Sequence, residues 1–119
     1  MTPLTVYGIP NCNTVKKART WLNDHGLEYT FHDFKKSGVT RELLDAWCSA
    51  FGWEKVLNRK GTTWKKLPAA ETEKVTDQAS AVNLLLSHTS AIKRPVIARQ
   101  GEALLLGFEE QAYAELLQQ

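Results

Sequence analysis

The spacing of apolar residues predicts a strand, a helix and a second strand in the first third of the chain. Residues 4–7 form a short β-type run that ends in a cluster of turn-forming residues. Apolar residues recur at helical spacing over residues 14–25. Residues 27–34 then alternate between apolar and polar with period two, as a half-buried strand does. This order predicts a βαβ unit with parallel strands.

Helical patterns dominate the middle of the chain. Thr40 suits the N-cap of a helix whose apolar stripe ends at Gly52. A short helix is expected over residues 55–57, and a polar, basic loop with a helical turn over residues 58–68. Thr76 or Asp77 starts another helix. Its predicted buried positions are Ala79, Val82, Leu85 and Leu86.

The end of the chain predicts a β-hairpin and a last helix. The apolar runs at residues 95–98 and 103–106 flank a turn sequence, and residues 108–117 predict a helix with Ala112, Tyr113 and Leu116 inward. The order β-α-β, helices, β-β-α is that of the thioredoxin-like architecture. We therefore expect one α/β domain over residues 1–119. Its mixed four-stranded sheet would carry a helical insertion, at about residues 36–92, between the βαβ and ββα halves.

Composition agrees with a folded domain and limits the partners. The 119 residues are 43% hydrophobic and 24% charged, close to the averages of folded proteins. Fifteen Lys and Arg against thirteen Asp and Glu give a net charge of +2, so no broad nucleic-acid surface is implied. The sequence shows neither an export signal nor a membrane-length apolar run. A cytoplasmic protein without a membrane partner is expected.

The two cysteines have different settings. Cys12 follows a predicted strand and opens a predicted helix, where the first N–H groups and the helix dipole stabilise a thiolate. The alternative for Cys12, a small buried apolar thiol, is opposed by its neighbours Asn11 and Asn13. Cys48 lies on the apolar face of its predicted helix, which favours a packed core thiol over a resolving cysteine for Cys12.

Two kinds of thiol chemistry at Cys12 are disfavoured because the residues that they need are absent. A phosphatase-type loop needs an arginine six residues after the cysteine, and Ala18 stands there. A dithiol oxidoreductase needs a second cysteine three residues on, and Val15 stands there. Redox chemistry at Cys12 would therefore use one thiol. The three histidines do not cluster, and no Cys/His spacing predicts a metal site.

A thiolate at Cys12 requires a cation as well as the helix. A drop of about two pKa units, roughly 2.7 kcal/mol, would make the thiol mostly ionised at neutral pH. A helix terminus supplies up to about 2 kcal/mol. Arg59, Arg94 and Lys16 are the candidate cations. The basic segment that contains Arg59 could also be a solvated loop, or a single-strand nucleic-acid site with Trp64 as a stacking platform.

Three segments together resemble the arsenate reductase-like (ArsC/Spx) family of the thioredoxin superfamily, and most closely its small YffB-like group. The segments are residues 6–18, 57–67 and 92–97, in the family's order and spacing. The resemblance implies that Cys12 is the nucleophile and that Pro95 takes the place of a cis-proline beside the active site. It also implies that Arg59 and Arg94 match two arginines that, in arsenate-reducing members, bind the oxyanion and lower the cysteine pKa.

At two positions this chain differs from other members of the family, and both differences bear on its function. Arsenate-reducing members carry a third arginine where this chain has Gly107, which disfavours arsenate reduction. The Cys-x-x-Cys switch of many Spx regulators would need a second cysteine at Val15. An Spx-like regulator that binds RNA polymerase, without enzymatic activity, is therefore disfavoured as well. It remains an alternative because the resemblance includes relatives that need no disulfide switch, and an arsenate reductase remains a further alternative.

The YffB-like resemblance implies a glutathione-dependent monothiol reductase that acts on small or protein-bound mixed disulfides. Glutathione would be a co-substrate, and no bound cofactor is expected. Arginine and lysine side chains could hold its two carboxylates. The residues expected to bind substrate or glutathione, beside the nucleophile Cys12, are Asn11, Asn13, Thr14, Arg59, Lys60, Arg94 and Pro95.

Overall fold

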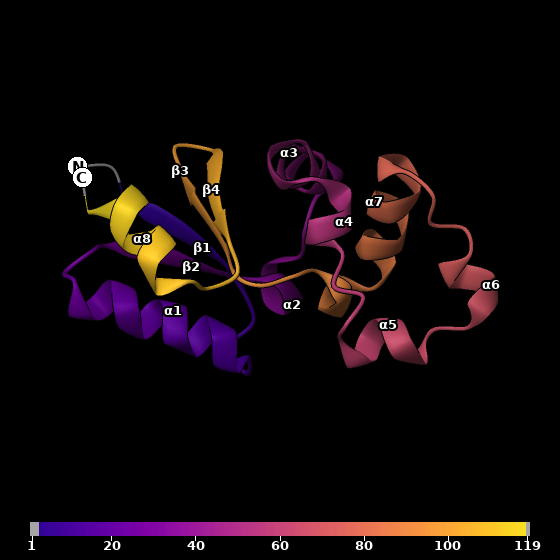
Figure 1. Cartoon of the computed structure of the whole chain (residues 1–119), viewed down its shortest axis with the longest axis horizontal. Helices are drawn as coiled ribbons and strands as arrows, with labels where there is room; N and C mark the ends of the chain where they lie inside the picture. Colours follow the sequence, from indigo (N-terminus) through magenta and orange to yellow (C-terminus); the bar gives the residue numbers. More distant parts are fainter. Residues whose placement is uncertain (1–2, 119) are drawn as a thin grey trace. The chain divides into compact units, whose positions relative to one another are not determined.

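The chain folds into two compact units. The computed structural model describes residues 3–118. One unit contains the residues up to Gly38 together with those from Arg94 onward, and the other is Val39–Lys93 (Figure 1). The first unit holds the sheet, and the second is built from short helices.

The sheet of the first unit is mixed and has four strands. Its order is β2-β1-β3-β4, with β1 parallel to β2 and antiparallel to β3, so the predicted βαβ opening and terminal hairpin are confirmed. Positive φ angles at Gln100 (53°) and Gly101 (81°) make the tight turn of that hairpin. The strands are β1 (Leu4–Gly8), β2 (Tyr29–Asp33), β3 (Val96–Arg99) and β4 (Glu102–Leu106).

Two helices, α1 (Asn13–Asp24) and α8 (Glu110–Leu117), pack against this sheet, and a single turn, α2 (Phe34–Ser37), follows β2 (Figure 1). Trp21 from α1 meets Tyr113 from α8 edge-on, with ring centroids 5.5 Å apart. The prediction that Leu116 points inward is wrong, since it is 44% exposed. The buried stripe of α8 runs from Tyr113 to Leu117, one turn further on.

The register of β1 sets the position of the segment before β3. Tyr7 pairs with Val96 in the antiparallel ladder. The carboxyl end of β1 therefore lies beside the amino end of β3, which follows directly on Arg94 and Pro95. The same end of β1 leads through a turn into α1. The amino terminus of α1 and residues 94–95 accordingly share one end of the sheet.

The second unit has its own apolar core, in which α3 packs against α4 and α7. Thr40 caps α3 as predicted, since its hydroxyl accepts the Leu43 N–H at 3.2 Å. Asp77 caps α7 and bonds the N–H of Ser80. Ala79 was expected to be buried but is exposed. The helices are α3 (Arg41–Phe51), α4 (Trp53–Val56), α5 (Thr62–Lys66), α6 (Ala69–Thr72), α7 (Gln78–Ser87) and the 3-10 turn η1 (Thr89–Ala91).

The buried face of α7 explains this difference. Its buried residues are Ala81, Val82, Leu84 and Leu85, so the buried face includes the predicted Val82 and Leu85 but is turned away from Ala79, and Leu86 is only partly buried. The sequence of α7 has few strongly polar residues, so it leaves open which face of the helix is buried. Packing against α3 decides which face this is. Among residues 3–118, no helix is long and apolar enough to span a membrane.

Removing the Tyr113 hydroxyl should destabilise the first unit. The buried phenol donates a hydrogen bond to the Gly107 carbonyl, and Tyr113→Phe would leave that carbonyl without this donor. We expect a loss of about 1–2 kcal/mol of unfolding free energy in guanidinium titrations followed by circular dichroism. The matched control is Tyr29→Phe, whose partly exposed hydroxyl should matter less, within about 0.5 kcal/mol. Equal losses in the two variants would contradict the assignment.

A candidate thiol active site

Cys12 stands at the junction between β1 and α1. It is the N-cap residue of α1, with φ −105° and ψ 124°, and its carbonyl accepts the Lys16 N–H at 2.9 Å. Gly8, at the end of β1, lets the first turn of α1 approach closely. A Cβ atom on Gly8 would lie 2.8 Å from a Val15 methyl carbon. A larger residue at that position would push the helix, and with it Cys12, away from the strand.

The surroundings of Cys12 favour its ionised form. The thiol is partly buried, and burial alone raises its pKa. Hydrogen bonding from the Val15 N–H, the hydrogen bond and charge of Arg94 and the Thr14 N–H outweigh that effect, so the pKa of Cys12 lies below its ordinary value. The candidate cation Lys16 is exposed and contributes its backbone N–H to the Cys12 carbonyl.

Arg94 reaches Cys12 from the segment that precedes β3. Arg94 is partly buried, and its peptide bond to the buried Pro95 is cis. The Pro95 carbonyl accepts the Gly107 N–H at 2.8 Å, which ties this segment to the end of the hairpin. The first unit thus brings together Cys12, Thr14, Arg94 and Pro95, all of which the sequence singled out.

Gly107 occupies a position shaped for glycine. Its φ of 79° lies in the left-handed region that other residues rarely adopt, and the residue is buried. Its N–H bonds Pro95 and its carbonyl accepts the Tyr113 hydroxyl. The backbone at Gly107 thus ties the end of the hairpin to the cis-proline segment. The resemblance places the third arginine of arsenate reductases at this same position.

Asn11 and Asn13 flank the thiol and are both exposed, in the turn before α1 and at its first position. They leave the mouth of the helix polar and open to solvent. The Val15 N–H is one of the first N–H groups of α1, which the sequence was expected to direct toward a thiolate at Cys12. Side-chain type does not signal which of these groups reaches the sulfur.

Arg59 and Lys60 belong to the second unit. The backbone before them is held by the Asn58 N–H, which donates to Ala91 at 2.8 Å. The exposed Arg59 guanidinium lies 3.8 Å from a Glu54 carboxylate oxygen. The Lys60 N–H donates to the Asn58 side chain at 3.2 Å. The prediction that Arg59 and Lys60 bind the substrate anion stays a prediction.

Cys48 has the opposite environment. It is 3% exposed in the core of the second unit, which confirms its interpretation as a packed thiol. Burial, with the Asp45 carboxylate second, raises the pKa of Cys48 to about 11. Both cysteines are free. Within residues 3–118, no three His, Cys, Asp or Glu side chains gather as a metal site would require.

A thiol at a strand-helix junction, facing a cis-proline segment on a mixed four-stranded sheet, defines a protein of thioredoxin-like fold with a candidate redox cysteine. Residues 7–116 match the model of the ArsC family, and the chain belongs to that family. The resemblance drawn from the sequence is therefore confirmed.

Proteins similar to this chain are found among solved structures and among curated sequences. A solved structure of a protein named YFFB is 48% identical, with a TM-score of 0.90 over 96% of this chain and 98% of that one. An arsenate reductase-related protein from Brucella melitensis is 46% identical, with a TM-score of 0.74 over 98% and 96%.

Among curated sequences, an uncharacterized protein of Haemophilus influenzae is 40% identical over 92% of this chain and 95% of its own length. The global transcriptional regulator Spx of Streptococcus mutans is 27% identical over 90% of this chain and 77% of its own.

The lowered pKa of Cys12 can be measured by its alkylation rate against pH. In Cys48→Ala, which leaves one thiol, the iodoacetamide rate should inflect below about 8.5, the ordinary value. Arg94→Gln in the same background should move the inflection upward because the cation is lost. Well above both inflections, the two proteins should react at similar rates. In the Cys48→Ala protein with Arg94 intact, an inflection at or above about 8.5 would contradict the lowered pKa of Cys12.

Proposed function

We propose that this protein is a glutathione-dependent monothiol reductase in which Cys12 attacks mixed disulfides. The observation that carries the proposal is the setting of the Cys12 thiol, whose pKa is lowered chiefly by the Val15 N–H and by Arg94 against the cost of burial. A thiol with a pKa near the ambient pH is the best attacking group in thiol-disulfide exchange. Membership of the ArsC family supports redox chemistry at this position.

The proposed reaction has two balanced exchange steps. The Cys12 thiolate attacks the glutathionyl sulfur of a mixed disulfide. A Cys12–glutathione disulfide forms, and the substrate thiolate leaves and takes up a proton. A second glutathione, as its thiolate, then attacks the glutathionyl sulfur of that intermediate. Glutathione disulfide is released and the Cys12 thiolate is restored, so one molecule of glutathione is consumed for each mixed disulfide reduced.

Each residue around the thiol has a proposed role. Arg94 stabilises the Cys12 thiolate and, as substrate arrives, can pair with a glutathione carboxylate. Thr14 contributes its N–H to the thiolate, and the exposed Asn11 and Asn13 offer polar contacts to the tripeptide backbone. Pro95 borders the site through the cis peptide bond.

In the second unit, Arg59 and Lys60 are proposed to add positive charge for the same co-substrate. Both side chains are exposed and so are available to an anion. The weak pairing of Arg59 with Glu54, at 3.8 Å between exposed groups, costs little to exchange. No bound cofactor takes part in the proposed reaction.

A regulator that binds RNA polymerase is the second candidate. It is supported by the Spx relatives, which are 26–27% identical over 90% of this chain. Val15 in place of a second cysteine removes the disulfide switch from such a regulator. Arsenate reduction has less support, because the backbone at Gly107 favours glycine where the resemblance expects arginine.

Turnover with a glutathionylated peptide tests the reductase proposal. With glutathione in excess, the wild-type chain should release the peptide thiol faster than glutathione alone, and Cys12→Ser should return the rate to that background because the nucleophile is lost. Cys48→Ala is the matched control and should retain activity. Mass spectrometry of the wild type should show one glutathionyl group on Cys12. Wild-type turnover no faster than background would contradict the proposal.

The regulator alternative predicts a different dependence on Cys12. Purified RNA polymerase should be retained by the immobilised wild-type chain and by Cys12→Ser to the same extent if binding alone is the function. We expect no retention above that of a resin without protein. Equal, saturable retention by both proteins, together with turnover at background, would replace the reductase by the regulator.

A further inference from the structure

The outer edge of β2 leaves main-chain groups unpaired in the sheet. Strand β2 is the last strand on its side, and no further strand among residues 3–118 pairs with it. The Leu4 N–H donates to the Glu28 carbonyl at 3.1 Å, and Tyr29 stands opposite Leu4 in the parallel register. Alternate residues of a parallel strand direct their N–H and C=O groups to opposite sides. The main-chain groups of Tyr29 and Phe31 therefore point away from the sheet.

This edge lacks two of the usual protections against pairing. Residues 29–32, Tyr-Thr-Phe-His, include neither lysine nor proline and combine residue types common in strands. Exposed edges of this kind are templates for an added strand. Its length gives no protection either, since five residues is an ordinary strand length.

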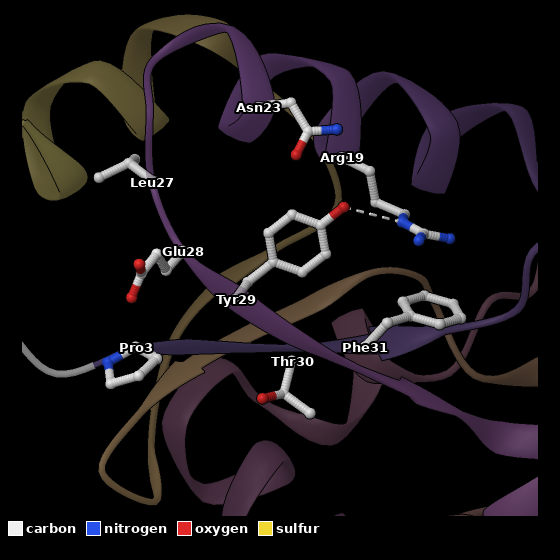
Figure 2. A pocket seen from close by; sticks show the side chains of 8 residues that line it. All are labelled: Pro3, Arg19, Asn23, Leu27, Glu28, Tyr29, Thr30 and Phe31. Atoms are coloured by element: carbon white, nitrogen blue, oxygen red, sulfur yellow. Dashed lines mark hydrogen bonds between the residues drawn. The ribbon is translucent and has the colours of Figure 1, made fainter.

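A fixed cation lies over the same edge. The Arg19 guanidinium sits 4.2 Å from the centroid of the Phe31 ring, and its Nε donates to the Tyr29 hydroxyl at 3.1 Å (Figure 2). Within residues 3–118, no carboxylate lies within ion-pair distance of Arg19. The side chain is thus held in place by neutral groups, and its charge is available to an anion.

An open hollow adjoins this cation. It measures about 720 Å³ and lies between α1 and β2, with Arg19 and Phe31 toward one end and Glu28 and Pro3 toward the other (Figure 2). Tyr29 stands between the two ends. A guest lying along β2 would meet positive charge at the Phe31 end and negative charge at the Glu28 end.

We propose that the free edge of β2 binds an extended acidic peptide by strand addition, with a peptide carboxylate paired to Arg19. The main-chain groups of Tyr29 and Phe31 would supply the ladder hydrogen bonds. Arg19 would select an acidic side chain beside Phe31, and Glu28 would disfavour a second one at the far end. In strand addition, main-chain hydrogen bonds typically give affinity, and the sites that receive side chains give specificity.

Charge argues against a second copy of this chain as the guest. An antiparallel pairing of two β2 edges would place the same face of both sheets on one side. With both outward-facing residues paired, Tyr29 of one copy would stand opposite Phe31 of the other, so the group beside Arg19 would be a tyrosine and not a carboxylate. A second copy would thus leave the Arg19 charge without a carboxylate, whereas a peptide carboxylate at that position complements the guanidinium. The proposal is independent of the chemistry at Cys12.

Blocked synthetic peptides test this proposal against the full-length chain. The probe is a heptapeptide of alternating threonine and valine with a central glutamate, and its partner has glutamine there instead. Amide signals followed by NMR should shift at Tyr29 and Phe31. The glutamate peptide should bind about three- to ten-fold more tightly than the glutamine peptide, since an exposed charge-assisted pair contributes modestly.

Two sets of controls separate strand addition from general attraction. Arg19→Gln should abolish the preference for glutamate, and Lys17→Gln, an exposed cation on the same helix, should preserve it. Of two probes N-methylated at alternate residues, only one should bind, because one side of an added strand faces β2. No shift at Tyr29 and Phe31, equal affinity for the two peptides, equal binding of both N-methylated forms, or self-association through β2 would each overturn the proposal.

Discussion

The antiparallel pairing of β1 with β3 holds the candidate site together. Cys12 follows β1 and Arg94 precedes β3, so the two residues lie far apart in the sequence. Tyr7 opposite Val96 places both at one end of the sheet, within hydrogen-bonding reach. A shift of this register by one residue would reverse the facing of every β3 side chain and move Arg94 along the edge. The buried Ile97, which belongs to the core beneath α1, opposes such a shift.

The two cysteines show how local structure changes one functional group in opposite directions. At Cys12 the donors Val15 and Arg94 outweigh burial and lower the pKa, whereas at Cys48 burial and Asp45 raise the pKa to about 11. The stabilisation from the Cys12 thiolate is present above the pKa of an unfolded thiol and is lost as the pH falls through the lower folded pKa. That from the neutral Cys48 is present below the unfolded pKa and is lost as the pH rises toward about 11.

Sequence periodicity was sufficient for most elements of the fold and for the position of Cys12. The strand-turn-helix pattern placed the thiol at a helix start, and Thr40 marked the start of α3. Periodicity failed where a helix face is decided by packing, as it did for Ala79 and Leu116. Each of these residues lies next to the buried stripe of its helix, so an error of one position reversed the assignment.

The contact between Arg94 and Cys12 depends on tertiary structure. The segment around Arg94 suggested a site through its resemblance to a family, while its distance from Cys12 depends on the sheet register. The sequence predicted that first-turn N–H groups of α1 stabilise the thiolate, but residue type could not single out that of Val15, since every residue but proline has one. The free edge of β2 likewise follows from strand order, which spacing along the chain does not determine.

The carbon-13 chemical shifts of the two cysteine Cβ atoms, followed against pH in the unmodified chain, test the central claim most directly. Each Cβ shift reports the ionisation of its own thiol, and neither thiol has to be alkylated. The account predicts that Cys12 titrates below about 8.5 and that Cys48 remains protonated well above this pH. Titration of Cys12 at or above about 8.5, or of both cysteines together, would contradict it.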